Sequence, residues 1–86
     1  MAATAEQIRI AATIDAKMQQ LLGAGCNDAV ILGEMFDHMP GFKLLLDSGQ
    51  PVLDELCDRF PSFYRFAKMI ENVAAAIQSG ALADLT

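Results

Sequence analysis

The sequence predicts an all-α fold, a compact bundle of four to five short helices that forms a single domain over residues 1–86. Apolar residues recur at spacings of three and four, and prolines and glycines divide the chain into short segments. No segment alternates polar and apolar residues over the length of a strand. A chain of 86 residues has room for one hydrophobic core. We expect residues 81–86 to be a frayed tail of this domain.

The first helix is expected to run from about Thr4 to Leu22. The Thr4 hydroxyl can accept a hydrogen bond from the first turn, and Gln7 follows three residues later, as in a capping box. Gly23 and Gly25 end the helix. Its apolar residues wind into one stripe, which consists of Ile10, Ala11, Ile14, Met18, Leu21 and Leu22.

Two further helices are expected before residue 50. Asn27 or Asp28 is a suitable N-cap for the second helix, and Pro40 is expected to end it. A short third helix covers about Phe42 to Asp47 and is closed by Gly49. The apolar face of the second helix consists of Ala29, Leu32, Met35, Phe36 and Met39.

The last two helices are expected to fill the rest of the chain. Pro51 fits the first turn of the fourth helix, and Pro61 ends it. Ser62 is the expected cap of the fifth helix, which stops at Gly80. The apolar face of the fourth helix consists of Val52, Leu53, Leu56, Cys57 and Phe60. That of the fifth consists of Phe63, Phe66, Ala67, Ile70, Val73, Ala74 and Ile77.

An internal repeat links two of these regions, because LGEMFDHMPGF, from Leu32, aligns with LDELCDRFPSF, from Leu53. The identical pairs are Leu32 and Leu53, Glu34 and Glu55, Asp37 and Asp58, Pro40 and Pro61, and Phe42 and Phe63. Each copy predicts a helix–proline–helix corner, with a phenylalanine that can fold back after the proline. Two copies are too few for a solenoid, which needs about three. The two units, about 29–47 and 50–79, are therefore expected to pack against each other and against the first helix.

Charge and hydropathy limit the classes of partner. The net charge is −5, with six Lys and Arg against eleven Asp and Glu, which disfavours binding to nucleic acid. No run approaches the roughly 18 apolar residues of a membrane span, so no membrane partner is expected. The first residues lack the pattern of a secretory signal, so a cytoplasmic location is expected. In that location the two cysteines are expected to be free thiols.

One group of side chains has metal-ligating chemistry. Glu34 and His38 lie four residues apart with Asp37 beside them, a spacing that can hold a divalent cation. The repeat argues against this interpretation, because the matching positions are Glu55 and Arg59, and arginine does not ligate metals. Both pairs suit contacts between a glutamate and a cation one turn apart. No cofactor is therefore predicted.

The cysteines raise the question of nucleophilic catalysis. Cys26 precedes a helix start, where the helix dipole can lower a thiol pKa, although Asp28 opposes this effect. Cys57 falls on an apolar face and is expected to be a small core residue. The single histidine, His38, has no motif that pairs it with either cysteine. The sequence predicts no enzymatic activity and leaves Cys26 as the candidate reactive thiol.

The apolar content of 53% exceeds the roughly 45–50% of globular chains and indicates surface that a partner can cover. A heptad-like seam on the first helix, Ile10, Ile14, Met18 and Leu21, is the expected interface. The leading hypothesis is a non-enzymatic protein-interaction module that forms a homodimer or binds a protein client. The alternative is a carrier or sensor of a small apolar ligand, in a Met- and Phe-lined cavity, or of a metal ion at Glu34, Asp37 and His38.

Overall fold

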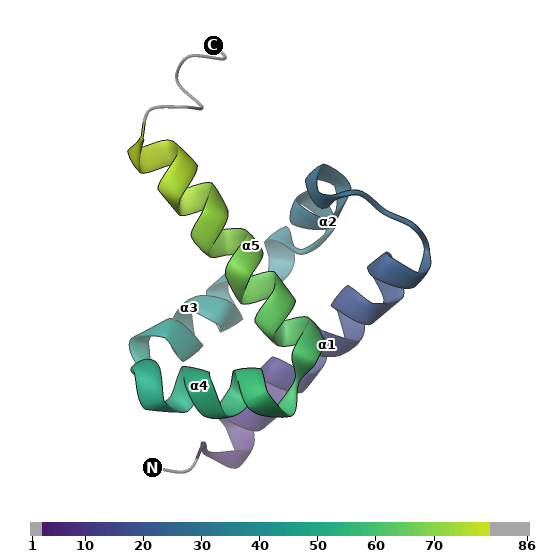
Figure 1. Ribbon diagram of the computed structural model, residues 1–86. Helices are drawn as coiled ribbons and strands as arrows, with labels where there is room; N and C mark the ends of the chain where they lie inside the picture. Colours follow the sequence, from purple (N-terminus) through teal and green to yellow (C-terminus); the bar gives the residue numbers. More distant parts are fainter. Residues whose placement is uncertain (1–2, 80–86) are drawn as a thin grey trace.

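A computed structural model describes residues 3–79 of the chain and shows an all-α bundle, as predicted (Figure 1). Residues 81–86, expected to be a frayed tail, lie outside the described residues. None of the helices within residues 3–79 is long and apolar enough to cross a bilayer. The elements are α1 (Ala5–Gly23), α2 (Asp28–Glu34), the 3₁₀ helix η1 (Phe36–His38), α3 (Met39–Asp47), α4 (Gln50–Arg59) and α5 (Pro61–Gln78).

The two longest helices, α1 and α5, cross at the centre of the molecule and make its most extensive helix contact (Figure 1). On one side α3 packs against α1 and α4, and α4 also packs against α5. In contrast, α2 lies apart from α4 and contacts mainly the adjoining η1. The second half of the chain therefore folds back over α1, while α2 remains at the edge.

One hydrophobic core joins the helices. The two phenylalanines that follow the repeated prolines meet in it, because the rings of Phe42 and Phe63 lie 5.9 Å apart. Phe66 contacts Phe42 edge to face at 5.1 Å, a favourable geometry for aromatic rings. The buried apolar residues are Ala11, Ile14, Met18, Leu21, Ile31, Met35, Phe42, Leu45, Val52, Leu56, Phe63, Phe66 and Met69.

Two helix starts follow the local sequence closely. The Thr4 hydroxyl accepts from the Gln7 amide at 3.1 Å, and the Gln7 side chain accepts from the Thr4 amide at 2.8 Å. The predicted capping box of α1 is therefore confirmed. At the start of α2 the Asn27 side chain accepts from the Val30 amide at 3.0 Å, as expected of an N-cap.

The first proline corner differs from the prediction. The second helix was expected to continue to Met39, but α2 ends at Glu34 and η1 follows. Pro40 does not terminate a helix; it lies in the first turn of α3, where its missing N–H leaves no hydrogen bond unmade. Gly33, next to the end of α2, contributes to the early stop because glycine is a weak helix former.

The second corner is the sharp helix-to-helix turn that the repeat predicts. The α4 helix continues to Arg59, Phe60 takes an extended conformation with φ −129° and ψ 91°, and Pro61 begins α5. Proline disfavours the helical region for the residue before it, which is consistent with the extended conformation of Phe60, although Met39 before Pro40 is helical, with φ −62° and ψ −41°. This proline, like Pro40, lies in the first turn of the following helix.

The cap of α5 comes from a distant part of the chain, so the prediction of Ser62 as the cap is wrong. The amides of Ser62 and Phe63 both donate to Oδ1 of Asp15 in α1, at 2.7 and 3.0 Å. The Gln19 side chain donates to Oδ2 of Asp15 at 2.9 Å. Asp15 is 8% exposed, so a buried carboxylate from α1 satisfies the free N–H groups at the start of α5.

Candidate functional site

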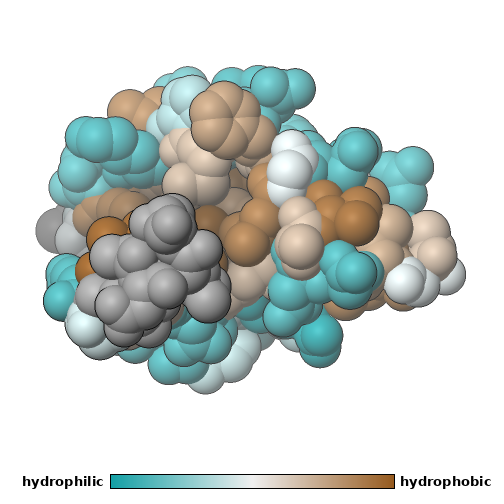
Figure 2. Space-filling view, turned by 90° about the horizontal axis from the view of Figure 1, so that it is seen from above, coloured by the Kyte–Doolittle hydropathy of each residue, from teal (hydrophilic) through white to brown (hydrophobic). Residues whose placement is uncertain are grey.

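Apolar side chains remain at several places on the described surface. On the face shown in Figure 2, apolar surface lies between hydrophilic side chains. Phe36 is the most exposed of the large ones, at 73%. Single exposed apolar side chains are common in soluble proteins and need no function. A hollow lined by several of them is a stronger indication of a binding site.

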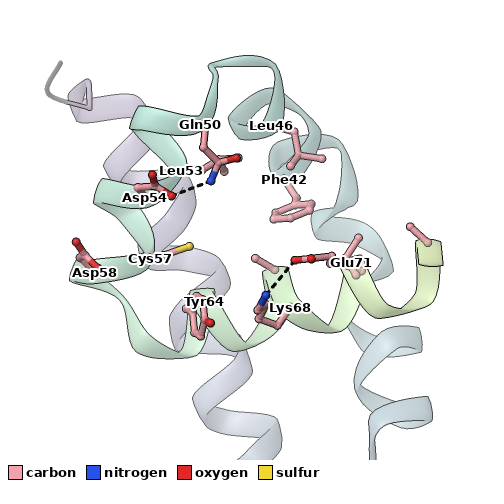
Figure 3. Close-up of a pocket in the computed structure, with 13 residues that line it drawn as sticks. Phe42, Leu46, Gln50, Leu53, Asp54, Cys57, Asp58, Tyr64, Lys68 and Glu71 are labelled. Atoms are coloured by element: carbon pink, nitrogen blue, oxygen red, sulfur yellow. Dashed lines mark hydrogen bonds and ion pairs between the residues drawn. The ribbon is translucent and has the colours of Figure 1, made fainter. Parts of the chain in front are cut away.

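Such a hollow lies between α3, α4 and α5, with a volume of about 860 Å³ (Figure 3). We call it the α3–α5 groove. Its lining residues are Phe42 and Leu46 from α3, Gln50, Leu53, Asp54, Cys57 and Asp58 from α4, and Tyr64, Ala67, Lys68, Ile70, Glu71 and Ala74 from α5.

The groove has a fixed floor and accessible apolar edges. Phe42 is 1% exposed and is held by its two aromatic contacts, whereas Leu46 and Tyr64 are 46% and 48% exposed. On α5, Ala67 and Ala74 follow the same helix face as Ile70, because spacings of three and four return to one side of a helix. These small side chains leave open the space that larger residues would fill.

Charged side chains border the groove. On α4, Asp54 and Asp58 lie one turn apart along its outer edge, and the Asp54 carboxylate accepts from Gln50 Nε2 at 2.7 Å (Figure 3). On α5, Lys68 Nζ lies 3.3 Å from Glu71 Oε2. The border therefore carries three carboxylates and one ammonium group, and that ammonium group already has an acidic neighbour.

The thiol of Cys57 forms part of the α4 wall and points into the space between α4 and α5 (Figure 3). Burial raises the pKa of the Cys57 thiol, Asp54 and Asp58 raise it further, and Lys68 lowers it. A raised pKa keeps this group a neutral thiol at pH 7. Cys57 packs against the core, as expected, and also supplies uncharged wall to the groove.

The predicted interface on α1 is not an exposed surface in this fold. Ile14, Met18 and Leu21 are 1%, 0% and 8% exposed, and Ile10 is half-buried. They pack into the core that α1 shares with its own chain, so the expectation that they lie free for a second subunit is corrected. The physical reason is that, in a domain with one core, the apolar stripe of a long helix is covered by neighbouring helices first.

The predicted metal-ligating residues do not form a cluster. Glu34 and Asp37 are exposed and His38 is half-buried, and the helix ends between Glu34 and the other two. Asp37 and His38 line a small hollow of about 210 Å³ beside Arg9 of α1, which Glu34 does not reach. Within residues 3–79 no group of three or more His, Cys, Asp or Glu side chains is placed to hold a metal ion.

The predicted contacts between glutamate and cation take other forms. Both carboxylate oxygens of Glu55 accept from the Ala3 amide, at 3.2 and 3.1 Å, which ties the start of the described chain to α4. Arg59 lies over the Phe60 ring at 5.7 Å. Neither Glu55–Arg59 nor Glu34–His38 is among the ion pairs of residues 3–79, which are all local pairs on α1, α3 and α5.

The other candidate thiol, Cys26, follows α1 and is half-buried against the core. Its amide donates to the Leu21 carbonyl at 3.1 Å, which fixes the chain as it leaves the helix. Cys26 and Cys57 are both free thiols in the structure, as expected. The Cys26 thiol makes no side-chain hydrogen bond within residues 3–79, and its reactivity stays a prediction.

Two features of the structure were missed from the sequence. Asp15 lies between Ala11 and Met18 on the apolar stripe, and an acidic residue there signals a buried carboxylate that needs partners. The groove has a weaker signal, the alanines within the apolar stripe of α5. The positions of these alanines are visible in the sequence. The gap beside them is not, because it depends on how α4 and α5 pack.

Comparisons of the chain with protein-family models, with curated proteins and with solved structures found no significant match. The interpretation of function therefore depends on the geometry of the α3–α5 groove.

Proposed function

We propose that this chain is a non-enzymatic protein-interaction module and that its α3–α5 groove receives an apolar helix of a partner protein. The observation that carries the proposal is the open hollow of about 860 Å³, with its apolar floor and charged border. Helical segments dock into such grooves through residues at i, i+3 or i+4, and i+7. An extended peptide would instead need a free sheet edge, and residues 3–79 contain no strand.

The exposed edges of the groove supply the binding energy in this proposal. Leu46 and Tyr64 are each about half exposed, and burying apolar surface contributes about 25 cal/mol per Å². The floor at Phe42 is already packed, so little ordering of the module is needed on binding. A preformed site of this kind lowers the entropic cost of association.

A second copy of the chain is the less favoured occupant. Each copy carries a net charge of −5, and like charges of this size oppose association. The stripe on α1 that suggested a homodimer is also used by the core. Analytical ultracentrifugation at high micromolar concentration is expected to give the monomer mass; a dimer that dissociates when Leu46 is replaced by glutamine would make the second copy the occupant.

A small apolar ligand is the second candidate function, because the groove volume lies within the roughly 300–1,000 Å³ of small-molecule sites. The dispersed positions of Glu34, Asp37 and His38 give no comparable support to a metal ion. Native mass spectrometry of freshly purified protein distinguishes the candidates. A retained organic mass would favour the carrier, and the bare chain mass is expected of the interaction module.

The groove is tested by a matched pair of variants, Leu46→Gln and Leu44→Gln. Both leucines are exposed on α3, at 46% and 60%, but only Leu46 lines the groove. Helix-forming peptides selected on wild type from a displayed library are expected to bind Leu46→Gln about tenfold more weakly, since a leucine contact is worth about 1.5 kcal/mol or more. They should bind Leu44→Gln as they bind wild type. Equal binding to both variants would place recognition elsewhere and overturn the proposal.

A further inference from the structure

The charges around the α3–α5 groove are unbalanced. Asp54 and Asp58 border one side, and Glu71 borders the other (Figure 3). The one cation of the lining, Lys68, lies 3.3 Å from Glu71, which offsets part of its charge. The Asp58 carboxylate makes no hydrogen bond or ion pair with any other residue of 3–79, so it is available to a ligand.

The negative field of these groups reaches the wall of the groove. The Cys57 thiol lies between Asp54 and Asp58 in the sequence of α4 and faces the hollow. After burial, the next causes that raise its pKa are these two carboxylates, and the opposing effect of Lys68 is smaller. A positive group entering the groove would therefore be stabilised where a negative one would be repelled.

We infer that the partner segment is a cationic amphipathic helix, whose apolar residues face Phe42, Leu53 and Ile70 and whose flanking Lys or Arg side chains face Asp54 and Asp58. This inference rests on the proposed function. The apolar contacts supply affinity, and the charges select the partner and its orientation. The chain's net charge of −5 adds long-range attraction for such a helix and speeds its association.

The test uses two synthetic peptides of about 18 residues, or about five helical turns, with leucines at the same positions. One peptide carries lysines beside the leucines and the other carries glutamates. Fluorescence anisotropy measures the binding of each labelled peptide to three proteins at low and at physiological salt. The proteins are wild type, the double variant Asp54→Asn/Asp58→Asn, and the control Asp28→Asn/Glu34→Gln, which removes two exposed carboxylates from α2.

The lysine peptide is expected to bind wild type, and added salt should weaken its binding. The Asp54→Asn/Asp58→Asn variant should bind about fivefold more weakly or worse, whereas the control should stay within about twofold of wild type. The glutamate peptide should bind much more weakly. Equal weakening by the two double variants would show diffuse attraction to an acidic protein, and this result would overturn the inference.

The same peptides separate failure of the inference from failure of the proposed function. A first outcome is equal binding of the lysine and glutamate peptides to wild type, with each binding Leu46→Gln more weakly than Leu44→Gln. In that case the groove is a docking site without the proposed charge preference. If the lysine peptide binds wild type and both leucine variants alike, the groove is not the docking site and both proposals fail. Absence of binding by the lysine peptide overturns the inference, and the displayed library then decides the proposed function separately.

Discussion

The two proline corners have similar sequences but different structures. In the second copy α4 runs to Arg59 and turns at once into α5, whereas in the first copy α2 ends at Glu34 and η1 separates it from α3. Both prolines lie in the first turn of the following helix, and both following phenylalanines enter the core. The repeated residues therefore determine where a helix starts and which ring is buried, and other contacts determine how sharp the corner is.

The main difference lies outside the repeat, in α1. Asp15 accepts hydrogen bonds from the amides of Ser62 and Phe63 and so closes the second corner. The start of α3 has no side-chain cap, and the η1 turn brings the chain into it. Within the repeat, Gly33 stands where the second copy has Asp54, which weakens the end of α2 but not of α4.

This difference also explains why the groove lies on one side of the molecule. Phe36 and Cys57 occupy equivalent positions of the repeat, yet Phe36 is 73% exposed and Cys57 is half-buried in the groove wall. The continuous α4 helix brings Cys57 between α3 and α5, whereas the break after α2 leaves Phe36 in solvent. The candidate docking surface is thus a property of the second copy.

The largest effect is expected from Asp15→Ala, which removes the distant cap and leaves two N–H groups of α5 unpaired. Loss of hydrogen bonds to a buried charged group should lower the free energy of unfolding by about 2–3 kcal/mol. Urea unfolding followed by circular dichroism measures the change. Asp15→Asn, which keeps one acceptor oxygen, should lose less.

The matched control for Asp15 is Asn27→Ala, which removes the local cap of α2. Asn27 is exposed and accepts one hydrogen bond, so the expected loss is about 1 kcal/mol or less. If the two alanine variants lost equal stability, the buried cap from α1 would not be what distinguishes the second corner.

A smaller effect, of opposite sign, is expected from Gly33→Ala at the first corner. A Cβ at Gly33 meets nothing within 4 Å, and alanine has the higher helix propensity, so stability should rise by about 0.4–1 kcal/mol. Gly41→Ala is the comparison, because its Cβ would lie 3.2 Å from Ile10 Cγ2 and the close approach should offset the gain. A loss of stability in Gly33→Ala would show that η1 depends on the flexibility of glycine.

Local signals in the sequence were sufficient for the fold class and most helix starts. The capping box at Thr4 and the cap at Asn27 involve residues only three apart, so their chemistry is visible without a structure. The end of the second helix was predicted incorrectly because proline is compatible both with a helix end and with a first helical turn. Whether Pro40 ends one helix or lies in the first turn of the next is decided by Gly33 and by the packing of α2.

The candidate site was less predictable, because it depends on contacts between residues distant in the chain. The stripe at Ile14 and Met18 is equally consistent with a core and with an interface, and the structure assigns it to the core. The repeat weakened the metal interpretation of Glu34 and His38 at the level of the sequence, and within residues 3–79 these side chains form no group of three potential ligands. The groove required the positions of α3, α4 and α5 together, which no local pattern contains.

The smallest expected effect is on the alkylation rate of the Cys57 thiol, which stands in the second copy of the repeat where the first copy has Phe36. Burial raises the pKa of Cys57, and Asp54 and Asp58 add to the rise, so less thiolate is present at a given pH and alkylation by iodoacetamide should be slow near neutrality. The rate should increase with pH beyond the range where the rate of an ordinary thiol levels off.

In Asp54→Asn/Asp58→Asn the carboxylates no longer oppose the thiolate, so the pH profile of the alkylation rate should move toward lower pH. Burial remains in this variant and keeps the pKa of Cys57 above that of an ordinary thiol. Measuring both profiles with Cys26 replaced by serine isolates Cys57. Identical profiles would mean that the two carboxylates do not act on the groove wall, and the negative field proposed to attract a cationic helix would lose its support.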